Sequence, residues 1–303
     1  MPAELSLTAS FERAPARSAT TEPAWVRAIL IAGAMIVLLL FVLIPLFSVF
    51  YYATRNGIAA CLSAIAQSDA RWAIALTLFT ASIAVPLNTA FGIAASWAIT
   101  KFDFPGKNVL ITLIDVPLAV SPVISGMILV LLFGAQGIFG AWLQSHDIHI
   151  IFALPGIVMA TVFVTFPFVA RELIPIMEST GSEEEEAALV LGAGGWQMFF
   201  RVTLPNIKWG LLYAVIICNA RAMGEFGAVS VVSGSVRGKT ITMPLFVEIL
   251  YNEYNLSAAF TIASLLTSLA IATLIAKRVV GRKAVAETAV HAIVEPRRNP
   301  DEH

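Results

Sequence analysis

From Ala28 to Phe50 the chain carries no charged side chain. An α-helix needs about 20 mainly apolar residues to cross the roughly 30 Å hydrocarbon core of a bilayer. Five more stretches meet this requirement: Trp72 to Thr100, Val109 to Phe133, Ile150 to Ala170, Trp209 to Val232 and Leu256 to Ala276. A water-soluble fold cannot hide six such helices and keep a wettable surface, so the sequence predicts an all-α membrane protein with six transmembrane helices.

The composition supports a membrane protein and excludes several other classes. Apolar residues make up 58% of the chain and charged residues 13%, against about 45–50% and about 25% in soluble domains. The net charge of −1 provides no basic field for nucleic acid, so we expect the lipid bilayer, and no nucleic acid, as a partner. The two cysteines and the four loop or tail histidines indicate neither a disulfide framework nor a metal site.

The distribution of basic residues predicts that both termini face the cytoplasm. Fourteen of the 19 Lys and Arg residues then lie inside and four outside, as expected from their enrichment in cytoplasmic loops. Residues 1–24 are predicted to be a disordered cytoplasmic tail, and residues 281–303 a cytoplasmic C-terminal tail. The transmembrane domain is expected over residues 25–280, with a long cytoplasmic loop at 171–208 and room for a short interfacial helix between Tyr51 and Arg71.

The long cytoplasmic loop contains a run of glutamates that follows Ser182. Ser182 and Glu185 have the spacing of a capping box, which predicts the start of a helix, and acidic side chains suit a helix N-terminus. Gly192 stands where a left-handed residue would end that helix, and a second short helix is expected from Trp196 to Arg201. Such a helix pair is suited to docking into the groove of a partner protein, although a surface helix that simply joins two spans fits these residues equally well.

This loop resembles the EAA loop of ATP-binding-cassette importer permeases, which have the MetI-like fold. The resemblance rests on Glu186-Ala187-Ala188, on Gly192, and on Val202-Thr203-Leu204-Pro205, where the family has Ile in place of Val202. It implies a coupling loop that fits a cleft of an ATPase subunit and transmits its closure to the membrane helices. The implied partners are two copies of an ATP-binding subunit, which hold ATP and Mg²⁺, and no cofactor is expected on this chain. The implied coupling residues are Glu186, Ala187, Ala188, Gly192, Leu204 and Pro205.

Three further segments resemble the oxyanion branch of these permeases: Phe102 to Lys107, Leu118 to Pro122 and Arg221 to Gly227. Between the last two spans, Arg237 to Thr240 and Met243 to Asn255 resemble the W-type subunits of sulfate/thiosulfate importers. The resemblance implies ATP-driven import across the bacterial inner membrane, with a T-type permease subunit as heterodimer partner. It also implies a periplasmic sulfate/thiosulfate-binding protein that delivers the anion. A molybdate or tungstate permease of the same fold is the nearest alternative.

Ionisable residues inside the predicted spans are candidates for the translocation path. Arg221 and Glu225 are four residues apart, and charged groups at such depth are costly unless they are paired or hydrated. They form either a neutralised pair that locks helices together or part of the path or its gate. Ser121 and Ser125 are further path candidates because their hydroxyl groups could meet an oxyanion. A proton-coupled secondary transporter, with Asp115, Arg221 and Glu225 as relay, is the alternative from another class.

One segment is similar at first sight to a nucleotide-binding loop. Gly234 to Thr240 ends in Gly-Lys-Thr, but its first glycine is one residue too close for a P-loop, and the predicted topology places it outside the cell. The sequence therefore predicts a transport subunit without an ATPase site of its own, and no enzyme.

Overall fold

The computed structural model describes residues 23–294, and every regular element in that part of the chain is a helix. The chain divides into two units after Ser48. The described part of the first contains α1 (Ala24–Leu38), the π-helix η1 (Leu39–Leu43) and the start of α2 (Ile44–Thr54), which continues into the second unit. Together they make one apolar helix from Trp25 to Thr54, long enough to span a membrane, as predicted.

In the second unit, four more helices are long and apolar enough to span a membrane. These are α4 (Ser68–Lys101), α8 (Leu154–Thr180), the continuous helix Gly195–Met223, and the first part of α14 (Leu256–Val294). Each corresponds to a predicted span. The helix α14 continues beyond residue 280, where the sequence placed the start of a tail, and residues 1–22 and 295–303 of the predicted tails lie outside the described part.

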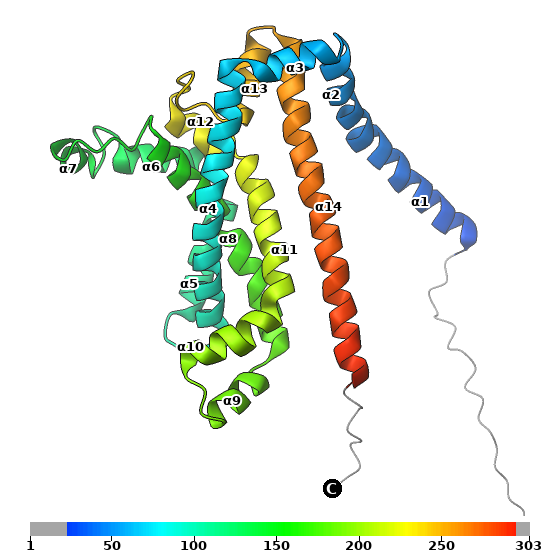
Figure 1. Ribbon diagram of the computed structural model, residues 1–303, viewed down its shortest axis with the longest axis vertical. Helices are drawn as coiled ribbons and strands as arrows, with labels where there is room; N and C mark the ends of the chain where they lie inside the picture. Colours follow the sequence, from blue (N-terminus) through cyan, green and yellow to red (C-terminus); the bar gives the residue numbers. More distant parts are fainter. Residues whose placement is uncertain (1–22, 295–303) are drawn as a thin grey trace, which may run out of the picture. The chain divides into compact units, whose positions relative to one another are not determined.

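The third predicted span, Val109 to Phe133, is bent by 108° into α5 (Lys107–Ala119) and α6 (Pro122–Phe133). Val120 and Ser121 are both non-helical at the break, and Ser121 is so because the residue before a proline avoids the helical region. The sequence predicted this stretch as one span, and the structure divides it into two helices at Pro122. Figure 1 shows α6 and α7 (Gly140–Ser145) extending sideways from the axes of α4 and α8.

The predicted bounds of the fifth span, Trp209 to Val232, were wrong at both ends. The helix starts at Gly195 as α10 (Gly195–Met198), continues through the π-helix η2 (Phe199–Thr203) and ends as α11 (Leu204–Met223). The separate helix expected from Trp196 to Arg201 is its first part. Pro205 does not interrupt it and lies in the first turn of α11, directly after the π-helix. A break at Gly224 then leads to the short helix α12 (Gly227–Ser233).

The core of the second unit forms where α8 packs against α4 and α11. Buried small residues allow close packing of membrane helices, and Asn88 of α4 adds a buried hydrogen bond from Nδ2 to Thr165 Oγ1 of α8 at 2.7 Å. At one end lie α3 (Ile58–Ala66), the short helix allowed for in the first loop, and α13 (Met243–Asn252). At the other end lie α9 (Glu183–Val190) and α10, in the loop predicted to be cytoplasmic (Figure 1).

Candidate functional site

The helix α9 is connected to its neighbours by glycines with positive φ at both ends. Gly181, after α8, has φ +71°, and Gly192, after α9, has φ +87°. Residues with side chains rarely adopt this conformation, so glycine is favoured at both joints. The predicted left-handed end at Gly192 is confirmed. Space is open around Gly192, where a Cβ would meet no atom within 4 Å.

The outer side of the α9–α10 turn presents large apolar side chains to solvent. Val190 is 87% exposed, Leu191 88% and Trp196 75%, and Trp196 stacks on Phe200 with ring centroids 6.0 Å apart. Exposed apolar clusters rimmed by polar residues are typical of protein–protein contact sites. We call the set Leu189, Val190, Leu191, Trp196 and Phe200 the coupling patch.

The capping box expected from Ser182 and Glu185 is absent. The Ser182 hydroxyl donates to Glu186 Oε1 at 2.6 Å instead of capping a backbone N–H. Glu186 and Ala187 are exposed at the surface and Ala188 is half-buried, so the predicted coupling residues of α9 lie beside the coupling patch. Leu204 and Pro205 start α11, with Leu204 packed on the core of α4, α8 and α11 and Pro205 exposed.

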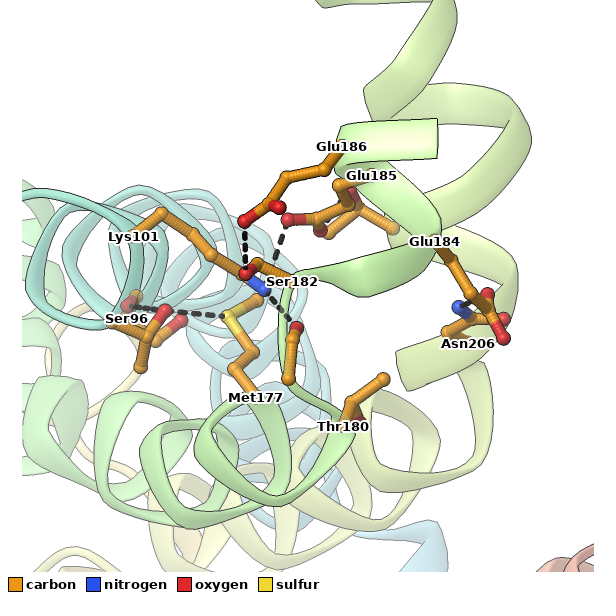
Figure 2. A network of polar contacts seen from close by, with 12 residues as sticks. Ser96, Lys101, Met177, Thr180, Ser182, Glu184, Glu185, Glu186 and Asn206 are labelled. Atoms are coloured by element: carbon orange, nitrogen blue, oxygen red, sulfur yellow. Dashed lines mark hydrogen bonds and ion pairs between the residues drawn. The ribbon is translucent and has the colours of Figure 1, made fainter. Parts of the chain in front are cut away.

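Glu185 is buried because it joins α9 to two membrane helices (Figure 2). Its Oε2 lies 2.9 Å from Lys101 Nζ at the end of α4, and its Oε1 accepts a 2.6 Å hydrogen bond from Thr203 Oγ1 at the start of α11. Lys101 also donates to the carbonyl of Gly181, at the end of α8. The Lys101 and Glu185 side chains are only 12% and 11% exposed. We call Lys101, Gly181, Glu185 and Thr203 the polar junction.

A second contact lies beside the polar junction. Asn206 of α11 donates from its side-chain amide to Glu184 Oε2 of α9 (Figure 2). Lys101, Glu184, Glu185, Thr203 and Asn206 were not recognised as site residues from the sequence. The one signal in the sequence is the acidic run itself, since four neighbouring like charges in a short helix require opposite charges or hydrogen-bond donors nearby.

The predicted pair Arg221–Glu225 is present. Arg221 Nη1 lies 2.8 Å from Glu225 Oε2, and Glu225 Oε1 accepts a 3.0 Å hydrogen bond from the backbone N–H of Ala228. The helix ends between the two residues, so Glu225 also satisfies a backbone donor at the start of α12. The Glu225 side chain is 1% exposed and that of Arg221 34%, which leaves the guanidinium partly accessible.

The breaks in the two bent helices lie against each other. A Cβ at Gly227 would come within 2.8 Å of Pro122 Cβ, and one at Gly126 within 2.8 Å of the Ala228 carbonyl oxygen. Ser121 is exposed at the start of α6, whereas Ser125 is buried and donates to the Ser121 carbonyl at 3.2 Å. The structure thus brings Ser121 and Ser125 to the same region as Glu225, with the Ser125 hydroxyl already used.

Asp115, the remaining relay candidate, pairs with a different residue. Its Oδ1 lies 3.1 Å from Arg171 Nε, so it links α5 to α8. Asp115 therefore pairs with Arg171 and not with the other two relay candidates. Among the described residues, no cluster of three His, Cys, Asp or Glu side chains could hold a metal ion.

Comparison with known proteins identifies this arrangement of helices and loop. Residues 89–284 match the family described as binding-protein-dependent transport system inner membrane component. The chain belongs to this family. A bacterial transporter for alginate, an ATP-binding-cassette importer of known crystal structure, contains a chain that superposes with a TM-score of 0.71 at 17% identity, over 86% of this chain and 96% of that one.

Members of the family with assigned transport roles are more similar in sequence. The sulfate transport system permease protein CysW of Escherichia coli K12 is 51% identical over 253 residues, covering 84% of this chain and 87% of that protein. The protein of the same name from Synechocystis is 50% identical over 258 residues, covering 85% and 94%. The E. coli permease protein CysT is 34% identical over 75% of this chain and 82% of its own length. The expected fold, a multi-span permease of the MetI-like kind, is therefore confirmed.

Proposed function

We propose that this chain is the W-type transmembrane permease subunit of an ATP-driven importer of sulfate and thiosulfate. The observation that carries the substrate assignment is identity at about half of all positions, over most of both chains, with CysW sulfate permeases from two distant organisms. Similarity to CysT is clearly lower, which favours the W-type over the T-type position in the complex. The subunit performs no covalent chemistry and has no ATPase site of its own.

The proposed complex lies in a bacterial inner membrane, with both termini of this chain in the cytoplasm. Its other components are a T-type permease subunit, two copies of an ATP-binding subunit that carry ATP and Mg²⁺, and a periplasmic binding protein for sulfate and thiosulfate. Support for the binding protein comes from the family description and from the alginate transporter, which has been crystallised with its substrate-loaded periplasmic protein.

The mechanism is alternating access driven from the α9–α10 turn. The coupling patch and the exposed Glu186 enter the cleft of an ATP-binding subunit, and burial of large apolar side chains supplies most of the affinity. When ATP closes the ATPase pair, α9 moves with the cleft. The helix Gly195–Met223 begins at this turn and ends beside the Arg221–Glu225 pair, so it carries the motion to the breaks in α5–α6 and α11–α12.

The substrate assignment is tested by uptake of labelled sulfate and, separately, labelled molybdate in cells that lack only this gene. Loss of sulfate uptake, restored by the gene, supports the proposal. Loss of molybdate uptake with sulfate uptake intact contradicts the substrate and retains the mechanism. Sulfate uptake that persists when the partner ATPase is inactivated favours a proton-coupled transporter and contradicts the mechanism.

The coupling assignment is tested by Gly192→Asp. Because no atom lies within 4 Å of a Cβ at this position, the substitution should not disturb packing, and the backbone strain of a side chain at φ +87° is shared by the Gly192→Asn control, so the two variants should reach the same level in the membrane. A charged side chain at φ +87° beside the coupling patch should abolish docking and transport. Gly192→Asn has the same size and backbone preference without the charge, so it should retain more transport. Normal sulfate uptake by Gly192→Asp would show that the turn is not a docking site.

A further inference from the structure

The proposed mechanism requires that α9 moves as one body with the membrane helices. Backbone geometry alone does not provide this, because both joints of α9 are glycines with positive φ and open surroundings. Glycine permits more backbone conformations than other residues, so these joints would let a displaced α9 swivel. The helix itself packs against α10 and η2, and its one buried residue is Glu185. The connection must come from side chains.

The polar junction has the geometry of such a connection. Lys101 binds the end of α8 through the Gly181 carbonyl and binds α9 through Glu185. Glu185 in turn binds Thr203, just before α11. The charges are largely shielded from water, at 12% and 11% exposure, so their attraction is screened much less than that of a surface pair. The side chains of Lys101 and Glu185 therefore connect α9 to three membrane helices, α4, α8 and α11.

We infer that Lys101 and Glu185 are positioning residues that fix α9 to α4, α8 and α11, so that movement of the docked turn reaches the translocation path. The inference rests on the proposed function, since it concerns how the coupling turn transmits force. Glu184 with Asn206 adds a second link to α11. Glu186, in contrast, bonds within its own turn to Ser182 and is left to meet the partner subunit.

The chain offers a matched control for the loss of an ion pair on the same side of the molecule. Lys107 Nζ lies 3.4 Å from Asp103 Oδ1 in the turn that follows α4. Asp103 is fully exposed and lies in the turn, and Lys107 is the first residue of α5, so this pair joins no two helices. Exposed pairs of this kind contribute little. Lys107→Met therefore removes one lysine and one ion pair without touching the polar junction.

The first experiment uses the whole transporter reconstituted in lipid vesicles with its binding protein. Sulfate taken up and ATP hydrolysed are measured together for wild type, Lys101→Met, Glu185→Gln and Lys107→Met. The two junction variants should still co-purify with the ATPase and keep the KM for ATP, while sulfate moved per ATP falls about tenfold or more, since each loses a charge-assisted hydrogen bond. The double variant should lose no more than either single one, and the exchange Lys101→Glu with Glu185→Lys should recover part of the loss.

Lys107→Met should match wild type. A sulfate-to-ATP ratio in the junction variants equal to that of Lys107→Met would overturn the inference. If Lys101→Met does not accumulate in the membrane, Glu185→Gln decides, because glutamine has nearly the same shape and can still accept from Thr203.

A second readout does not depend on the substrate, so it separates failure of the inference from failure of the proposed function. Spin labels at Glu183 and Asp103, both exposed and outside the coupling patch, report the distance between α9 and the end of α4. The two native cysteines are replaced first, by Cys61→Ser and Cys218→Ala. In the wild-type complex the distance should stay constant when ATP is added, and in Lys101→Met it should broaden or shift. An equal shift in both would overturn the inference, even for a transporter of another anion.

Discussion

The contact between α6 and α12 predicts that Gly126→Ala destabilises the protein, whereas a glycine-to-alanine change inside a helix usually stabilises it. In a helix interior, alanine is favoured over glycine by about 0.5–1 kcal/mol, so the substitution would ordinarily stabilise. Here the new Cβ would lie 2.8 Å from the Ala228 carbonyl oxygen and 2.9 Å from Val231 Cβ. Both distances are shorter than van der Waals contact, and one of the neighbours is backbone, so α6 and α12 must separate.

Overpacking of this kind costs about 1–3 kcal/mol, and subtracting the gain in helix preference leaves a net loss of about 0–2.5 kcal/mol, with about 1–2 kcal/mol in the middle of that range. At about 2–4 °C per kcal/mol for a domain of this size, the midpoint of thermal unfolding in detergent should fall by about 2–8 °C. Sulfate uptake should fall as well, because the separation displaces α12 and with it Glu225, whose Oε1 bonds the N–H of Ala228.

Gly224→Ala is the matched control for this prediction. Gly224 lies in the same region with φ −90°, and a Cβ there would be 3.5 Å from its nearest neighbour, the Ala220 carbonyl oxygen. We expect its midpoint to be unchanged or slightly raised, because alanine restricts the unfolded chain. A rise of the midpoint in Gly126→Ala, or equal midpoints in the two variants, would refute the assignment of a tight α6–α12 contact.

Two further predictions concern the ends of the helix Gly195–Met223 and the turn before it. Arg221→Met leaves the carboxylate of Glu225, 1% exposed, without its cation and should lower stability by roughly 3 kcal/mol or more, whereas Glu225→Gln keeps the acceptor for Ala228 and should lower it less. Membrane levels and thermal midpoints measure both, and the reverse order would contradict the buried pair. Val190→Asp with Leu191→Asp should change stability by less than about 0.5 kcal/mol, because both side chains are almost fully exposed, but should abolish co-purification of the ATPase subunit. Full ATPase capture by this variant would exclude the coupling patch as the docking surface.

The spans could be predicted from the sequence because they depend on one local quantity, the length of an apolar run. Whether the helix stays straight or bends within an apolar run could not be predicted in the same way. Val109 to Phe133 is apolar apart from Asp115 and a few hydroxyl residues, yet it turns by 108° where Ser121 precedes Pro122. The proline is visible in the sequence, but α8 and α11 also contain prolines and remain continuous, so the outcome depends on what packs against each one.

The predicted end of the fifth span was wrong for a related reason. Arg221 and Glu225 have the spacing of a helical ion pair, and the pair exists, but the helix stops at Met223. Glycines at 224 and 227 allow the break, and the Glu225 carboxylate replaces a missing helical acceptor by binding the N–H of Ala228. Sequence spacing cannot distinguish an ion pair within a helix from one that bridges the end of a helix, because a separation of four residues is compatible with both arrangements.

The glutamate run shows most clearly that sequence-local capping rules do not predict tertiary contacts. The spacing of Ser182 and Glu185 favours a capping box, which contributes about 1 kcal/mol through local hydrogen bonds. Lys101 and Thr203, far away in the sequence, offer Glu185 a charged and partly buried alternative, and charge-assisted bonds of this kind are roughly twice as strong as neutral ones. The tertiary partner therefore prevails over the local cap.

Successive residues of a helix point about 100° apart, so four adjacent glutamates cannot share one surface or one partner. Their mutual repulsion is tolerable because at least three of the four have different partners: Glu184 has Asn206, Glu185 has Lys101 and Thr203, and Glu186 has Ser182. Three of these four partners, Asn206, Lys101 and Thr203, belong to the membrane helices, and Ser182 belongs to the exposed turn before α9. The run is thus neither a solvated acidic face nor a cap alone. It divides α9 into a side that holds the membrane helices and a side that is open to a partner, which is the arrangement that a coupling element needs.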